Sequence, residues 1–426
     1  MVSDQNAFCA NRLISTVGVG ILASLSLLVD CVHADDLSAP RGNVAVQDRP
    51  HPEWDALGIR VGQFLVWPSV TAEIARSDNI FAARTGAQAD AIFGLTPRVA
   101  IRSDWNQNGF YLTGKTTLQH YAAHDDQDSR QFALGGGGFL NVRHDLSVFA
   151  EASFVRVLIP RSSDAYARNS RTPLLYHQTQ AKLRAEKQFN RLKLTLKGQF
   201  DDFRFLNGRT PTGAPLDEGF RNRRSFAGEF RADYTLSEAV SVYGEETVVR
   251  ESLSSIYRNQ FETQTLVGAN FEITRLITAQ VGVGYLTSAY GGSPAPSGVG
   301  NFTERVKLQY FPTQLLTVTL TGQQAIIASG IPTSPAFNSK TIVLQVDYEL
   351  LRNLIITGRV SPGWDKYQVI NRYDRDLSLD LGAKYKISRG LNFGVNIGRT
   401  QRRSSGAQAG DTFNDDNIAL SVTLQK

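Results

Sequence analysis

Residues 181–200 read AKLRAEKQFNRLKLTLKGQF, and from Leu192 onward leucine alternates with hydrophilic residues. Successive side chains of a β-strand point to opposite faces. One face of an extended strand here is apolar and is formed by Leu192, Leu194 and Leu196. The other face is formed by Lys193, Thr195 and Lys197. Such a strand separates an apolar medium from water, and the rest of the chain decides where the water is.

The same two-residue period recurs along the chain, for example in residues 111–118, 226–234, 342–350 and 377–385. These runs extend over about 10–14 residues, whereas strands of soluble proteins usually have about 5–6. A tilted strand that crosses a bilayer needs about 9–11 residues. After the N-terminus no stretch approaches about 18 consecutive apolar residues. The pattern therefore predicts membrane-spanning strands rather than membrane-spanning helices.

Short turns and long polar loops alternate between the runs. The short turns are predicted at residues 104–106, 144–145, 190–191, 237–238, 274–276, 312–314, 352–353 and 388–390. The long segments include residues 77–90, 159–173, 206–223 and 402–417. This asymmetry is typical of outer-membrane barrels. Aromatic residues before the turns indicate an interfacial girdle at the periplasmic end: Phe189, Tyr234, Tyr310, Phe311, Tyr348 and Tyr385.

We therefore predict an all-β fold, a single transmembrane antiparallel β-barrel of about 18 strands (16–18) over residues 63–426. The strands are expected to begin near residues 63, 91, 108, 130, 146, 176, 192, 225, 239, 260, 277, 301, 315, 340, 354, 375, 391 and 414. The leucine face of each strand then meets lipid, and the lysine face meets water inside the barrel. A charge on the lipid face at mid-depth costs about 2–4 kcal/mol, so the alternation specifies the strand register strongly.

The N-terminus has the features of a signal peptide. A polar region with Arg12 precedes an apolar region at 13–29, and Val32-His33-Ala34 forms a cleavage site before Asp35. A membrane-anchor helix and a lipoprotein modified at Cys31 are the alternatives. The domain boundaries are thus a signal peptide at 1–34, a periplasmic leader at 35–62 and the barrel at 63–426. The mature chain has no cysteine, which excludes disulfides and thiol catalysis.

No residue pattern indicates an enzyme, a cofactor or a metal. The six histidines show no metal-binding spacing. His124, Asp125 and Asp126 lie in a predicted external loop, where a solvated loop is the simplest interpretation. Four glycines at 135–138 lie in the middle of a strand with no following helix, so they indicate room for a neighbour or a bend rather than a phosphate loop. The balance of 45 Lys+Arg against 40 Asp+Glu is too even and dispersed for nucleic-acid binding.

The inward face of the barrel is the best functional lead. The candidate lumen-lining residues are Arg98, Arg102, Lys115, Lys182, Arg184, Lys193, Lys197, Arg231, Arg305 and Lys307, and the same face carries Arg359 and Lys384. The acidic residues there include Glu151, Glu186, Glu229, Asp233, Glu245, Asp347, Glu349 and Asp380. One interpretation is that these charges pair across adjacent strands. The other is that a basic surplus near strands two, six, seven and twelve favours anionic solutes.

The segment RPHPEWDALGIRVGQFLVWPSV (49–70), followed by SDNIF (77–81), resembles the opening of a family of outer-membrane β-barrel porins (type 2). The residues that match the family's opening motif are Pro52, Glu53, Trp54, Asp55, Gly58, Ile59, Arg60, Asp78, Asn79 and Ile80. The resemblance extends over nearly the whole mature chain. It implies an outer-membrane channel with no catalytic residues. Because members are often encoded beside polysaccharide synthesis and export systems, it also implies a role in exopolysaccharide or capsule delivery.

We therefore expect an outer-membrane channel that takes part in the export of an acidic exopolysaccharide or capsule. A passive diffusion porin for small solutes is one alternative, and a non-conducting structural or enzymatic surface barrel is another. The expected partners are outer-membrane lipid and lipopolysaccharide, the barrel-assembly machinery during insertion, and polysaccharide export components, but no nucleic acid. The leader residues 54–60 either dock a partner or plug the lower mouth of the barrel. The segments 158–173 and 206–223 are candidates for loops that fold inward.

Overall fold

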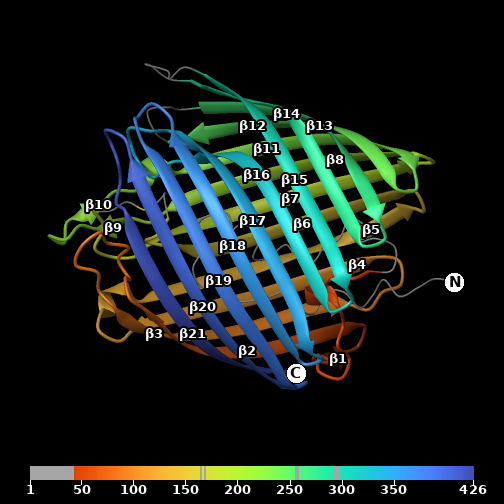
Figure 1. Ribbon diagram of the computed structural model, residues 1–426, viewed down its shortest axis with the longest axis horizontal. Helices are drawn as coiled ribbons and strands as arrows, with labels where there is room; N and C mark the ends of the chain where they lie inside the picture. Colours follow the sequence, from red (N-terminus) through yellow and green to blue (C-terminus); the bar gives the residue numbers. More distant parts are fainter. Residues whose placement is uncertain (1–42, 164–165, 167–168, 255–258, 292–297) are drawn as a thin grey trace.

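Eighteen long antiparallel strands form one closed barrel in the computed structural model of the chain (Figure 1). The structure describes residues 43–163, 166, 169–254, 259–291 and 298–426. The expected signal peptide, 1–34, and residues 35–42 of the leader lie outside the described residues. Each strand pairs with the next, and pairing of the last strand with the first closes the ring. The prediction of an all-β antiparallel barrel of about 18 strands is therefore confirmed.

The barrel strands are β2 (Phe64–Ser77), β3 (Asp90–Ser103), β4 (Gly109–Tyr121), β5 (Ser129–Arg143), β6 (Leu146–Ile159), β7 (Leu174–Phe189), β8 (Leu192–Phe205), β11 (Arg223–Ser237), β12 (Val240–Leu253), β13 (Asn259–Thr274), β14 (Ile277–Tyr290), β15 (Val299–Thr313), β16 (Leu316–Ala328), β17 (Ala336–Leu351), β18 (Leu354–Tyr367), β19 (Tyr373–Ser388), β20 (Leu391–Ser405) and β21 (Phe413–Gln425). Each begins within four residues of its predicted start, and β17 differs most.

Three short strands and three single-turn helices were not predicted. They are β1 (Ile59–Val61), β9 (Gly208–Arg209), β10 (Pro215–Leu216), η1 (Val46–Asp48), η2 (Asp125–Gln127) and η3 (Gly219–Arg221). Elements of two or three residues are too short for a two-residue or a 3.6-residue period to show. In Figure 1, β1 and the C-terminus lie at the end of the barrel with short turns, and β9 and β10 lie at the end with long loops. Among the described residues, no helix has the length and hydropathy needed to cross a membrane.

Apolar side chains cover the outward face of the wall. Leu196 and Phe226 are each 60% exposed although both are large and apolar, as expected for a surface solvated by lipid. At the short-turn end five of the six predicted girdle aromatics are exposed: Phe189, Tyr234, Tyr310, Tyr348 and Tyr385. Phe311 is buried instead, because it directly follows Tyr310 in β15 and its side chain therefore points to the other face.

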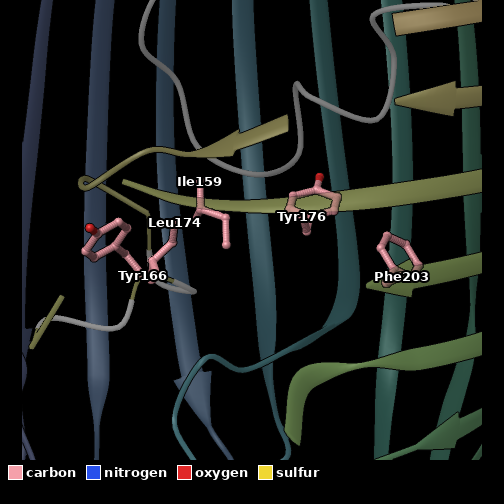
Figure 2. Packing of buried hydrophobic residues seen from close by; sticks show 5 residues of the cluster. All are labelled: Ile159, Tyr166, Leu174, Tyr176 and Phe203. Carbon is pink, nitrogen blue, oxygen red and sulfur yellow. The ribbon is translucent and has the colours of Figure 1, made fainter. Parts of the chain in front are cut away.

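The inside of the barrel holds mostly polar side chains and two small apolar clusters. The larger cluster lies at the loop end and consists of Ile159, Tyr166, Leu174, Tyr176 and Phe203 (Figure 2). Four of these belong to β6, β7 and β8, and Tyr166 belongs to the loop that joins β6 to β7. Tyr166 of this loop is therefore packed on the inner wall. This position agrees with the sequence analysis, in which residues 158–173 are a candidate for a loop that folds inward.

The glycine run of β5 leaves room for neighbouring chain. A Cβ atom at Gly137 would lie 2.6 Å from the carbonyl oxygen of Ala150 and 2.9 Å from the hydroxyl of Tyr111. That hydroxyl donates a hydrogen bond of 2.8 Å to Glu151 on β6. The small residues thus let an inward tyrosine lie across β5 and reach the next strand, which is the close approach that the sequence indicated.

Candidate functional site

All ten predicted lumen-lining basic residues lie on the inward face. Strand register demonstrates this, because Arg98 is opposite Lys115, Arg184 is opposite Lys197, and Lys193 is opposite Asp233. Residues opposite each other on paired strands share a face. The remaining members of the set occupy the same face by the two-residue period: Arg102, Lys182, Arg231, Arg305 and Lys307. The structure does not bring them into one cluster, however, because they lie on strands all round the barrel.

One side of the interior is a network of ion pairs, which we call the paired wall. It consists of Arg184, Glu186, Lys193, Lys197, Glu229, Arg231, Asp233, Glu245 and Arg305. Glu245 is 4% exposed and lies 3.2 Å from Arg231 and 2.9 Å from Arg305. Lys197 lies 2.9 Å from Glu229, and Lys193 lies 3.3 Å from Glu186. The predicted surplus near strands six, seven and twelve is therefore largely neutralised here.

The opposite side of the interior carries a second group of basic residues. Arg98 on β3, Lys115 on β4 and Lys384 on β19 line one cavity of about 480 Å³, and we call these three residues the basic wall. In the described part of the chain, no carboxylate lies within 4.0 Å of Lys115 or Lys384. The acidic residues that line this cavity are Glu73 and Asp415.

Hydroxyl and amide groups cover most of the wall around these cations. They include Thr71, Thr96, Thr117, Gln119, Asn392 and Asn396. Some hydrogen-bond each other across the strands, as Thr71 does with Thr423 at 2.8 Å. Such groups can both donate and accept hydrogen bonds. The cavity therefore combines fixed positive charge with a surface suited to hydroxyl-rich molecules.

The leader forms part of the same cavity. Residues 43–56, which we call the strap, lie against the inner wall at the short-turn end. The backbone N–H of Val46 donates to Oγ1 of Thr317 at 3.0 Å, and Val46 is completely buried. The amide of Gln47 donates to Asp347 at 2.8 Å and to Thr357 at 2.7 Å. The strap thus follows the inner surface of β16, β17 and β18.

Glu349 is the main anchor of the strap. Its side chain is 1% exposed and lies 2.7 Å from Arg49, 3.6 Å from His51 and 3.2 Å from Arg352. Burial, followed by the nearby Lys386 cation, lowers the pKa of His51. The imidazole is therefore neutral near neutral pH, and Arg49 supplies the strap's positive charge to Glu349.

A second anchor joins the strap to β19. Lys386 donates to Asp55 at 2.6 Å and lies 3.3 Å from Nδ1 of His51. Its side chain is only 5% exposed, so this ion pair is shielded from solvent. Together the two anchors hold both halves of the strap, and residues 43–56 contribute to the lumen.

The family motif residues have structural contacts. Asp55 also accepts the backbone N–H of His51 at 2.6 Å, and the carbonyl of Pro52 accepts from Arg389 at 3.1 Å. Gly58 has φ +76, and a Cβ there would lie 2.7 Å from the ring of Trp67. Arg60 lies 2.7 Å from Asp104. Glu53, Trp54 and Ile59 belong to this same segment, which precedes β2.

The other half of the motif lies at the loop end. Asn79 donates to the carbonyls of Ala83 at 2.9 Å and Asn414 at 2.7 Å, and the N–H of Ile80 bonds the carbonyl of Gln88. The side chain of Asp78 accepts the backbone N–H of Asp416 at 2.8 Å. The motif therefore connects the first hairpin to its neighbours at both ends of the barrel, and the structure does not bring its two halves together.

At the loop end a cationic side chain closes over the cavity. Arg161 donates to Oε1 of Gln127 at 2.6 Å and lies 4.8 Å from the ring of Phe81 and 4.9 Å from that of Tyr166. Nearby, Nδ1 of His124 and a carboxylate oxygen of Asp90 form a hydrogen bond of 2.8 Å. No group of three or more metal-binding side chains occurs among the residues that the structure describes.

Sequence reasoning named residues 54–60 and 158–173 as candidates for segments that plug or fold into the barrel, but it did not identify Gln47, Arg161 and Tyr166 as lining residues. The cavity extends from Gln47 in the strap to Arg161 and Tyr166 in the loop. None of these three lies on a barrel strand, so the alternation that located the other lining residues carries no information about them. Gln47 is a polar residue next to a Pro-containing segment, and nothing in the sequence marks it as a lining residue. Only its contacts with residues far away in the chain place it in the cavity.

The chain is similar to one protein family and to several solved structures. A family described as "Putative beta-barrel porin 2" matches residues 51–426. Similar solved structures are a mutant of the ferric enterobactin receptor PfeA of Pseudomonas aeruginosa (8% identity, 91% of this chain and 84% of that chain, TM-score 0.47), OpdL of Pseudomonas aeruginosa (14%, 86% and 99%, 0.43) and OccAB3 of Acinetobacter baumannii (13%, 86% and 100%, 0.45). No curated protein matches the sequence. The family match takes in the strap from His51 onward and all the strands.

Proposed function

The chain belongs to the family of putative β-barrel porins 2, whose members are outer-membrane barrels, and we propose that it is a channel for anionic, hydroxyl-rich solutes. One observation carries this proposal. A single cavity extends from the strap at one end to the loop residues Arg161 and Tyr166 at the other, and the basic wall lines it. The short-turn end is the periplasmic end, as in other barrels of this kind.

The chemistry of the cavity supports an acidic saccharide as the solute. Fixed cations that face a lumen raise the local concentration of anions. Threonine, asparagine and glutamine side chains offer exchangeable hydrogen bonds to hydroxyl groups. Because Lys115 and Lys384 form no ion pair in the described structure, both remain able to interact with a passing carboxylate, sulfate or phosphate group.

Export of an acidic exopolysaccharide or capsule is the finer proposal. It rests on the resemblance to the family, because members are often encoded with polysaccharide export systems. A passive diffusion porin for small anions is the second candidate, and the strap favours it. A strap anchored by Glu349 and Lys386 narrows the periplasmic mouth, which suits a small solute better than a polymer unless the strap is displaced.

A clean deletion strain distinguishes the two candidates. We expect loss of extracellular and capsular polysaccharide with normal uptake of small anions if the barrel serves export. Normal polysaccharide with slowed anion uptake assigns it to passive diffusion and contradicts export. The purified protein in planar bilayers provides the control, because a barrel without single-channel conductance is neither kind of channel and would refute the proposed function altogether.

A further inference from the structure

Three basic side chains stand directly opposite one another on the outward face of adjacent strands. Arg156 on β6 is the register partner of His177 on β7, and His177 is the partner of Arg204 on β8. The two-residue period gives this face, because Phe154, Leu183 and Leu196 share it and are exposed. We call Arg156, His177 and Arg204 the outer basic row.

More arginines extend this row in both directions. Arg130 lies on β5, Arg224 on β11 and Arg250 on β12, all on the outward face and all within four residues of the loop end of their strands. Asp202 lies on the same face and contacts Arg204 at 2.9 Å and Arg224 at 3.2 Å. In the described part of the chain, no carboxylate lies within 4.0 Å of Arg130, Arg156, His177 or Arg250.

Apart from Asp202, which contacts Arg204 and Arg224, this arrangement lacks a counter-charge within the described protein. Arg130, Arg156 and Arg250 have no carboxylate within 4.0 Å among the described residues, and an uncompensated charge on a lipid-facing surface is costly. The Nε atom of Arg156 is also buried with no hydrogen-bond partner, although buried polar atoms normally have one. An anion bound along the row would satisfy both requirements, and guanidinium groups bind phosphate with two parallel hydrogen bonds.

The surface below the row is apolar and aromatic. The ring of His177 lies 5.6 Å from that of Phe154 and 6.2 Å from that of Phe132, centroid to centroid. Farther along, Phe200 and Phe226 pack at 5.0 Å on the same face. A molecule that matches the whole surface therefore has phosphate groups at the level of the strand ends and hydrocarbon chains at the level of the aromatic rings.

The same strands look different at their periplasmic ends. Phe189 and Tyr234 face outward there, and the outward basic residue Lys187 is paired with Asp145. The basic row is thus specific to the loop end, where the outer leaflet lies. The row is no part of the proposed channel, because its side chains point away from the lumen.

We propose that the outer basic row and its flanking arginines bind the phosphate groups of a phosphorylated glycolipid of the outer leaflet, of the lipopolysaccharide class. The apolar surface below the row packs against the acyl chains of the same molecule. The bound lipid supplies the negative charge that the described residues of this face lack, and it fixes the depth of this side of the barrel in the membrane.

The test is the thermal unfolding midpoint of the whole mature protein in detergent micelles, titrated with diphosphoryl lipid A. We expect saturable stabilisation by diphosphoryl lipid A and at least a tenfold weaker apparent affinity for the double variant Arg156→Gln, Arg250→Gln. The matched control is Arg143→Gln, Arg191→Gln, which removes two positive charges at the periplasmic turns and should bind as the parent does. The double variant Arg156→Lys, Arg250→Lys keeps the charge and should retain most of the affinity.

Two further probes identify the ligand. Dephosphorylated lipid A should stabilise the parent at least tenfold more weakly than diphosphoryl lipid A, and inorganic phosphate at the same concentration should not stabilise it. Equal stabilisation by the dephosphorylated lipid, or by inorganic phosphate alone, would overturn the proposal. Undiminished affinity of the Arg156→Gln, Arg250→Gln variant would overturn it as well, provided that this variant migrates as a folded barrel in unheated gels.

Discussion

The two sides of the lumen both carry basic residues and yet differ in how far carboxylates neutralise them. On the paired wall, Glu186, Glu229, Asp233 and Glu245 lie within ion-pair distance of the arginines and lysines. On the basic wall, Lys115 and Lys384 face the cavity without such a partner among the described residues. The difference teaches that the charge a solute meets depends on strand register, since register decides which side chains become neighbours.

The largest effect is expected from removing the charge of the basic wall. The double variant Lys115→Gln, Lys384→Gln should reduce a preference for anions to near neutrality, because Arg98 and Arg161 then face two carboxylates, Glu73 and Asp415, in the cavity. The control is Lys197→Gln, Glu229→Gln, which removes one ion pair of 2.9 Å and leaves the net charge unchanged. Reversal potentials in a salt gradient measure the ion selectivity of both double variants. Equal shifts in the two double variants would show that the walls do not differ.

A smaller change of selectivity, with a loss of stability, is expected from breaking the paired wall. Glu245→Gln deprives Arg231 and Arg305 of their shared carboxylate. Anion selectivity should rise because the wall gains one net positive charge. The free energy of unfolding should fall by about 2 kcal/mol, since hydrogen bonds to charged groups are lost although Arg231 keeps Asp233 as a partner. Urea unfolding in detergent measures the loss, and an unchanged midpoint would mean that the pairs are not coupled as the distances indicate.

The smallest effect on selectivity, with a clear effect on conductance, is expected from loosening the strap. Glu349→Gln removes the carboxylate that holds Arg49 and should raise single-channel conductance by up to about twofold, because a freed strap no longer fills the mouth. Glu304→Gln is the control, since Glu304 forms an exposed ion pair with Lys340 outside the lumen. Deletion of residues 43–56 should give at least the same increase. A deletion that leaves the conductance unchanged would show that the strap does not narrow the path.

Most of the fold was predictable because one physical requirement acts on every strand. A lipid-facing position excludes charge, so the alternation in residues 192–197 or 377–385 reveals both the strand and its faces. The inward position of the ten basic residues follows from the same rule. The ion pairs do not, because Arg305 and Glu245 lie on strands that are not neighbours and meet across the curved wall. The contacts of the strap could not be predicted for a similar reason, since Gln47 and its partner Thr357 are 310 residues apart.

The pairing of β2 with β21 sets the order of events in assembly. Thr71 and Thr423 meet at 2.8 Å across a separation of 352 residues, and nine residue pairs join these two strands. Before they meet, the first and last strands both have unpaired backbone N–H and C=O groups, which lipid cannot satisfy. The other seventeen strand pairings join strands that follow one another in the chain. The pairing of β2 with β21 joins the first strand to the last. The barrel therefore becomes a sealed, lipid-stable object only in its final step, and until then its nascent edges must be protected by something other than the protein itself.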